Sequence, residues 1–91
     1  MAYEWDAAKA AANRRKHGVS FNAVLDFDWA KALVVADDRA DYGELRWLAL
    51  GMIGERLHSL VFTIRGTRIR VISLRRAGRK ERNLYEETSR R

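Results

Sequence analysis

The sequence contains no cysteine and no proline among its 91 residues. The lack of cysteine excludes a disulfide framework and a thiolate metal site. No run of about 18 apolar residues is present, which excludes a transmembrane helix. The N-terminal segment has an acid at position 4 and lacks the basic-then-apolar pattern of a signal peptide. We therefore expect a cytoplasmic protein that does not enter a membrane.

The length and the apolar content together predict one globular domain over residues 1–91. Apolar residues make up 47% of the chain, which is too high for a disordered protein. Repeats, low-complexity tracts and linkers are absent, and six glycines provide the breaks between elements. A chain this short buries only about 60–65% of its unfolded surface, so a partner would add much to its stability.

Positive charge is concentrated in the second half of the chain. The formal net charge is +6, with −2 in residues 1–45 and +8 in residues 46–91. Arginine supplies 14 of the 18 basic side chains, and its planar guanidinium binds phosphate in a bidentate manner. This composition favours RNA, DNA or an acidic protein as the partner. The alternative is a soluble protein that is basic without a functional reason.

Two helices are predicted near the N-terminus. Asp6 is a suitable N-cap for a helix over residues 7–17, which are rich in strong helix formers. Gly18 then supplies the left-handed residue that commonly ends a helix. Ser20 is a second N-cap, and we expect a short helix after it with Phe21 and the following apolar residues on one face.

The hydrophobic pattern changes to that of β-strands from residue 32 onwards. Tight turns at residues 54–56 and 66–67 are expected to join the last three strands into an antiparallel meander. The predicted strands cover residues 32–36, 45–53, 57–65 and 68–76, a helix is expected over 79–89, and residues 2–5 are compatible with a short strand. The order predicts an α+β fold with two N-terminal helices, a four-stranded, largely antiparallel sheet and a C-terminal helix.

The last predicted strand and the helix after it carry the densest basic cluster. It comprises Arg68, Arg70, Arg75, Arg76, Arg79, Lys80 and Arg82. A rigid strand with an adjoining helix can hold phosphates at fixed positions, so the cluster predicts a phosphodiester-binding face. The alternative is a charged strand edge that discourages aggregation. By simple alternation, Arg70 and Arg75 point to opposite faces of the sheet unless a bulge intervenes.

Other side chains that can carry chemistry are few. His17 is a candidate acid or base or a helix cap, whereas His58, early in a strand, is expected to be structural. Glu81 and Tyr85 share a helix face and are either catalytic or an ion pair with a packed ring. A cluster of acids, Asp37, Asp38, Asp41 and Glu44, has no histidine near it, so we expect a solvated loop and no metal site.

Several short runs in this order and spacing resemble the BrnT toxin family. They are Glu4-Trp5-Asp6, Lys9, Asn13, Lys16-His17-Gly18-Val19-Ser20-Phe21, Tyr42-Gly43-Glu44-Leu45-Arg46, Arg70-Val71-Ile72-Ser73-Leu74-Arg75-Arg76-Ala77, Glu81 and Tyr85. Together they extend from about residue 3 to residue 87, nearly the whole chain. Asp6, Gly18 and Ala77 are expected to serve the fold. Leu74 departs from the small residue that family members often have there.

The resemblance implies a bacterial ribonuclease toxin of a type II toxin–antitoxin system, with a RelE-like fold. It implies cleavage of RNA without metal or cofactor, a block of translation, and neutralisation by a BrnA-like antitoxin. That antitoxin carries a ribbon-helix-helix domain, through which the toxin would reach operator DNA. The positions that match the family signature and are candidates for function are His17, Glu44, Arg46, Arg70, Ser73, Arg75, Glu81 and Tyr85.

A ribonuclease that works without metal needs a base for the 2′-OH, an acid for the 5′-oxygen and cations for the phosphorane. Arg75 with Ser73 is the preferred catalytic pair, and Arg70 is a further candidate for stabilising charge. Candidates for the base are Glu81, His17 and Lys80, and those for the acid are Tyr85 and His17. The predicted RNA-binding residues are Arg65, Arg68, Arg76, Arg79, Lys80 and Arg82. The alternatives are a non-catalytic RNA- or DNA-binding module and a protein-interaction module.

Overall fold

Strand β1 (Ala2–Glu4) opens the fold and leads into helix α1 (Ala7–His17). The structure, a computed structural model, describes residues 2–39, 41 and 43–90. Asp6 caps α1, because its carboxylate accepts a hydrogen bond of 2.9 Å from the Lys9 N–H. Gly18 ends the helix with a φ of 71°, which glycine adopts without steric cost. The predicted boundaries of this helix are therefore confirmed.

The segment after Gly18 forms a short 3-10 helix, η1 (Phe21–Asp26). Ser20 caps it as predicted, since its hydroxyl accepts from the Asn22 N–H at 3.2 Å. Phe21 and Val24 are buried, so this single tight segment still supplies two side chains to the core. In the described part of the chain, α1 is the one α-helix before the main strands.

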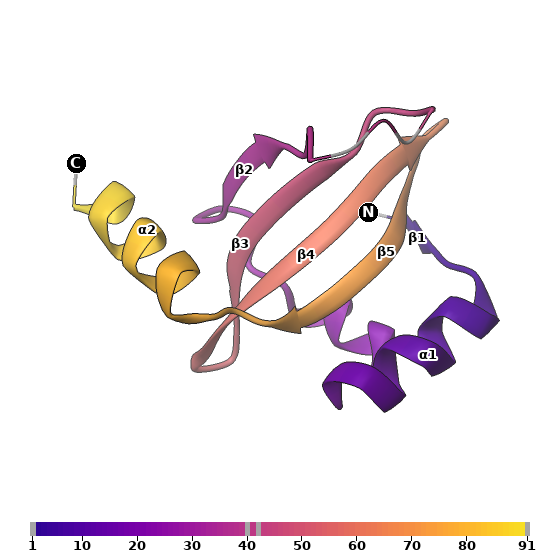
Figure 1. Cartoon of the computed structure of the whole chain (residues 1–91), viewed down its shortest axis with the longest axis horizontal. Helices are drawn as coiled ribbons and strands as arrows, with labels where there is room; N and C mark the ends of the chain where they lie inside the picture. Colours follow the sequence, from indigo (N-terminus) through magenta and orange to yellow (C-terminus); the bar gives the residue numbers. More distant parts are fainter. Residues whose placement is uncertain (1, 40, 42, 91) are drawn as a thin grey trace.

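Five strands form one mixed sheet (Figure 1). After β1 they are β2 (Leu33–Ala36), β3 (Trp47–Ile53), β4 (Arg56–Arg65) and β5 (Arg68–Arg76), and helix α2 (Arg79–Ser89) follows them. The spatial order is β1-β5-β4-β3-β2. Neighbouring strands are antiparallel except for β1, which runs parallel to β5.

The predicted arrangement of two N-terminal helices and four largely antiparallel strands is therefore wrong. Residues 2–4 form a fifth, parallel strand, and the second helix is a 3-10 segment. A strand of three residues shows no alternation of its own, and its partners lie far away along the chain. Glu4 pairs with Arg70, and the Tyr3 hydroxyl accepts a hydrogen bond of 2.8 Å from Trp29 Nε1.

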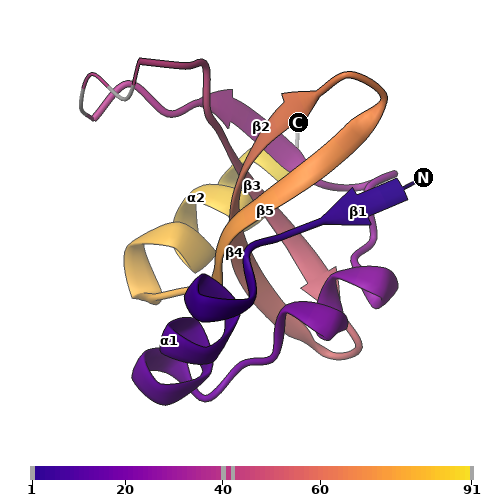
Figure 2. The ribbon, with the colours of Figure 1, turned by 90° about the vertical axis from the view of Figure 1, so that its right-hand side faces the viewer.

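One face of the sheet, which we call the core face, is covered by apolar packing. η1 packs on this face, and α1 lies along the edge of β5 (Figure 2). The aromatic rings of Phe27, Trp29, Phe62 and Trp47 form a continuous series of edge and stacked contacts. The buried side chains of the core face are Ala49, Leu60, Phe62, Ile69, Val71 and Leu74, and η1 and the segment after it add Phe21, Val24 and Phe27.

The opposite face has a much smaller apolar cluster. Leu50, Leu57 and Ala77 are buried there, and Tyr85 of α2 packs against them. No residue of α2 is buried, and the helix extends away from one end of the sheet (Figure 1). Among the described residues, none of the helices has the length and apolar character needed to span a membrane.

Candidate active site

Strand β5 carries a one-residue bulge in its pairing with β4. Val71 lies opposite Phe62, but Ser73 lies opposite Val61, so Ile72 is the extra residue on β5. An extra residue in one strand changes the face to which the later side chains of that strand point. Simple alternation would place certain side chains before and after Ile72 on opposite faces of the sheet. The extra residue places them on the same face.

The bulge places Arg70 and Arg75 on one face of the sheet. Their partners in β4 are Thr63 and Ser59, which are four residues apart and so point the same way. Ser73 also lies on this face, which we call the polar face and define by these five residues. The two arginines are separated by about 13 Å along the strand, so they serve different contacts.

Arg75 is held by the first turn of α2. It donates from Nη1 to Glu81 Oε1 at 2.7 Å and from Nη2 to Glu81 Oε2 at 2.9 Å. Nη1 also donates to the Arg76 carbonyl at 3.2 Å. These three bonds use at most three of its five N–H groups, and a third of the side chain (33%) is exposed. The guanidinium thus keeps donors for an anion while its position is fixed.

Glu81 is committed to structure on both of its oxygens. Besides the two bonds from Arg75, Oε1 accepts from the Gly78 N–H at 2.9 Å, which caps the start of α2. Partial burial acts to raise the pKa of Glu81, but the hydrogen bonds from Arg75 and Gly78 and the charge of Arg75 together hold it below its ordinary value. An ionised, fully paired carboxylate with a low pKa is a weak base near neutral pH.

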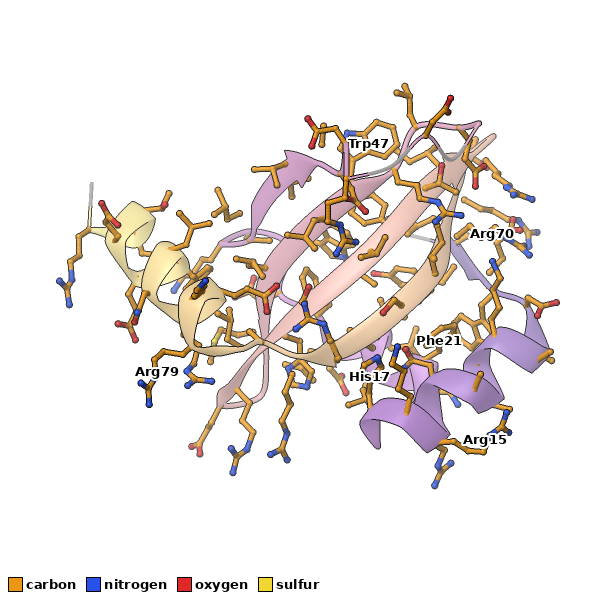
Figure 3. The ribbon with its side chains drawn as sticks, in the orientation of Figure 1. Arg15, His17, Phe21, Trp47, Arg70 and Arg79 are labelled. Atoms are coloured by element: carbon orange, nitrogen blue, oxygen red, sulfur yellow. The ribbon has the colours of Figure 1, made fainter. Side chains whose placement is uncertain are left out.

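His17, the last residue of α1, lies at a groove between that helix and β5. The groove is lined by Lys9, Ala12, Asn13, Lys16, His17, Ile72 and Ser73, so the bulge forms one of its walls. Partial burial, the charge of Lys16 and the charge of Arg75 all lower the pKa of His17. A lowered pKa favours the neutral imidazole, which is the form that can accept a proton. Figure 3 shows His17 on the side of α1 toward the sheet, whereas Arg15 points away.

Asn13 is a residue of this groove to which the sequence assigned no role. It is buried and joins α1 to β5, donating to the Leu74 carbonyl at 2.7 Å and accepting from the Leu74 N–H at 3.2 Å. It also donates to the Val19 carbonyl at 3.1 Å. One signal in the sequence could have indicated a role for it. Asparagine has a low helix propensity, and here it lies inside a helix made otherwise mostly of alanine, arginine and lysine.

The remaining predicted residues do not line the groove beside His17. Arg70 pairs with Glu4 at 2.7 Å and joins β1 to β5. The Tyr85 hydroxyl donates to the Lys31 carbonyl at 3.1 Å, which attaches α2 near the start of β2. Arg82 donates to the Ala77 carbonyl at 2.9 Å. The exposed members of the predicted RNA-binding set are Arg65, Arg68, Arg76, Arg79, Lys80 and Arg82.

The acidic loop is tied by arginines. Asp37 accepts two bonds from Arg39, at 2.7 and 2.9 Å, and Glu44 lies between Arg46 and Arg65. The structure as described shows no group of three or more residues placed to hold a metal ion. Tyr42, part of the family signature, lies outside the described residues. His58 is buried, with Nδ1 2.9 Å from the Arg56 carbonyl, as expected of a structural histidine.

Comparison with known proteins supplies the family. A comparison with curated proteins found no match. A family model described as ribonuclease toxin, BrnT, of type II toxin–antitoxin system matches residues 5–81. The matched segment contains His17, Ser73, Arg75 and Glu81, and Tyr85 lies beyond it. The chain therefore belongs to the BrnT family of ribonuclease toxins of type II toxin–antitoxin systems.

Proposed function

We propose that the protein is an endoribonuclease that cleaves RNA without metal, at a site formed by His17, Ser73 and Arg75. The observation that supports this most strongly is the junction of α1 and β5. There, a histidine with a lowered pKa, which the charge of Arg75 helps to lower, lines one groove with a serine of the bulged strand. A neutral base beside a fixed cation is what attack by a 2′-OH on its own phosphodiester requires.

His17 is the proposed base. It removes the proton of the 2′-OH as that oxygen attacks phosphorus and the P–O bond to the 5′-oxygen breaks. The 5′-oxygen takes a proton from water and leaves as a 5′-hydroxyl, a 2′,3′-cyclic phosphate remains on the other product, and His17 returns its proton to solvent. Of the three candidates for the base, Glu81 is paired on both oxygens and Lys80 is exposed on α2. A positioned base contributes about 10²–10⁴-fold to the rate.

Arg75 is the proposed stabiliser of the phosphorane. Its free N–H donors bind the non-bridging oxygens as negative charge develops, and Ser73 adds a hydroxyl donor on the same face. Glu81 is a positioning residue, because it fixes the plane of the guanidinium through two bonds. Arg70 contacts the RNA backbone at a neighbouring phosphate, which its distance along the strand supports.

The proposed biological role follows from the family. An antitoxin partner is implied by type II membership, and we propose a BrnA-like protein with a ribbon-helix-helix domain that reaches operator DNA on behalf of the complex. An acidic or amphipathic segment of that antitoxin would cover the basic residues that RNA needs. Free toxin would cleave RNA in the bacterial cytoplasm and so block translation.

The test is cleavage of end-labelled RNA in EDTA by the wild type, Arg75→Ala and Arg15→Ala. Arg15 is the matched control, because it loses the same charge from an exposed position on the outer side of α1. We expect equal cleavage by the wild type and Arg15→Ala, and a loss of about 10²–10³-fold for Arg75→Ala.

Two results would contradict the proposal. Full activity of folded Arg75→Ala would remove this residue from the site. Intact RNA in every reaction, also with translating ribosomes added, would leave a non-catalytic module that binds RNA with a steep salt dependence.

A further inference from the structure

We infer that Asn13 is a positioning residue of the ribonuclease site, because it holds the bulged segment of β5 and the histidine-bearing end of α1 in one fixed relation. The inference rests on the proposed function. It concerns a side chain that touches neither Arg75 nor, as proposed, the reacting atoms.

At Leu74, the backbone N–H and C=O on the open edge of β5 need hydrogen-bond partners, and Asn13 lies against them. β1 pairs with β5 only as far as Arg70, so the edge beyond that residue has no strand beside it. The carboxamide of Asn13 pairs with both backbone groups of Leu74, as a neighbouring strand would. Leu74 is fully buried, so its N–H and C=O depend on this side chain.

Leu74 also lies in the part of β5, just after the bulge, where side chains again point to the polar face. The bulge at Ile72 precedes it, and Ser73 and Arg75 are its neighbours on each side. A bulge interrupts the regular ladder and leaves the extra residue unpaired, so contacts from outside the ladder help to hold the strand beside it. The two bonds from Asn13 to Leu74 fix the register after the bulge and with it the direction of Ser73 and Arg75.

The third hydrogen bond of Asn13 fixes the end of α1 that carries His17. The carboxamide donates to the Val19 carbonyl, just beyond the end of α1, and Asn13 and His17 are one turn apart on the same helix face. The charged groups near His17 are Lys16 and Arg75, and Lys9 lines the same groove. One side chain thus holds the base and the cation of the site in a single arrangement.

The test compares Asn13→Ala and Asn13→Asp with the wild type, and Tyr3→Phe is the control. Tyr3→Phe also removes a hydrogen bond that ties together distant segments, the one from Trp29, but it lies outside the site. Asn13→Asp keeps the acceptor for the Leu74 N–H, so it carries the test if Asn13→Ala does not fold. We expect kcat to fall by roughly 10²-fold for Asn13→Ala and less for Asn13→Asp, with KM changed little.

Three further measurements separate positioning from loss of stability. Rates are measured on folded protein well below the melting transition, where Tyr3→Phe keeps its full kcat. The pKa of His17, followed by NMR titration, should rise toward its ordinary value in Asn13→Ala as the histidine loses its partial burial in the groove and moves away from Arg75. The Leu74 amide should lose its protection from hydrogen exchange in the same variant.

Unchanged kcat and an unchanged His17 titration in the folded Asn13 variants would overturn the inference. A wild type that does not cleave RNA would instead contradict the proposed function. The titration and the hydrogen exchange would still decide whether Asn13 sets the arrangement, so the two failures are distinguishable.

Discussion

The two faces of the sheet are built from different side chains and covered by different elements. The core face buries aromatic and aliphatic side chains under η1 and the segment after it, in a series of ring contacts. The polar face has two arginines held by ion pairs, and the helix beside it has no buried residue. We therefore expect stability to depend mainly on the first face and the proposed chemistry on the second, so substitutions should affect one property at a time.

The largest expected effect comes from removing His17. His17→Ala should lower kcat by about 10²–10⁴-fold, because the proposed base is lost, while the midpoint of thermal unfolding stays near that of the wild type. The measurement is single-turnover cleavage of RNA beside a melting curve.

His58→Ala is the matched control for that prediction. It removes a histidine buried within β4, so it should lower the melting temperature and leave the kcat of the folded protein unchanged. Should both histidine variants lose the same property, the separation of the two faces would be wrong.

Gly51→Ala should be the strongest single test of the core face. An added Cβ at Gly51 would lie 2.7 and 2.9 Å from two carbons of the Phe27 ring, which is well inside van der Waals contact. We expect a loss of about 1–3 kcal/mol in the free energy of unfolding, with the kcat of the folded fraction retained. Urea denaturation measures the loss, and Phe27→Leu in the same chain should recover part of it.

Glu81→Gln should have a smaller effect that depends on pH. The folded-state pKa of Glu81 lies below its ordinary value of 4.5. The ionised carboxylate therefore stabilises the folded state at pH values above 4.5, and this stabilisation is lost as the pH falls through the folded-state pKa. Wild type and Glu81→Gln should therefore differ by about 1 kcal/mol at pH 7, and the difference should disappear in acid.

Urea midpoints at several pH values measure that difference. Glu86→Gln, an exposed change on the same helix, should differ little from the wild type at any pH. A constant gap between the wild type and Glu81→Gln down to strong acid would show that the carboxylate charge has no part in attaching α2.

The elements with local signals were predicted well from the sequence. Asp6 and Gly18 mark the ends of α1, because capping and the left-handed conformation depend on the residues themselves. Gly54 and Gly66 have φ values of 61° and 59° and sit in the turns of the meander, where glycine adopts the left-handed conformation without steric cost. Helix α2 begins and ends at the residues that were predicted, Arg79 and Ser89.

The features that were not predicted depend on contacts between distant residues. Residues 2–5 were compatible with a short strand, but the parallel pairing of β1 with β5 was not predicted, because β5 lies far away along the chain. The bulge at Ile72 shows only when β4 is placed opposite β5; the sequence raised it as a condition for Arg70 and Arg75 to share a face. Asn13 has a role only once its helix lies against Leu74. The sequence therefore named candidate residues, but their arrangement in space could not be derived from it.

The parallel pairing of β1 with β5 has a consequence for how the protein is made. Glu4 and Arg70 are 66 positions apart, and yet they must meet to complete the sheet. During synthesis, β1 leaves the ribosome before β5, so it has no strand to pair with until β5 has followed it. Contacts of such long range form slowly, because a large loop must close before they add any stability. The sheet is therefore completed only after β5 has been translated, and a nascent chain that stalls before β5 does not yet have the proposed site assembled.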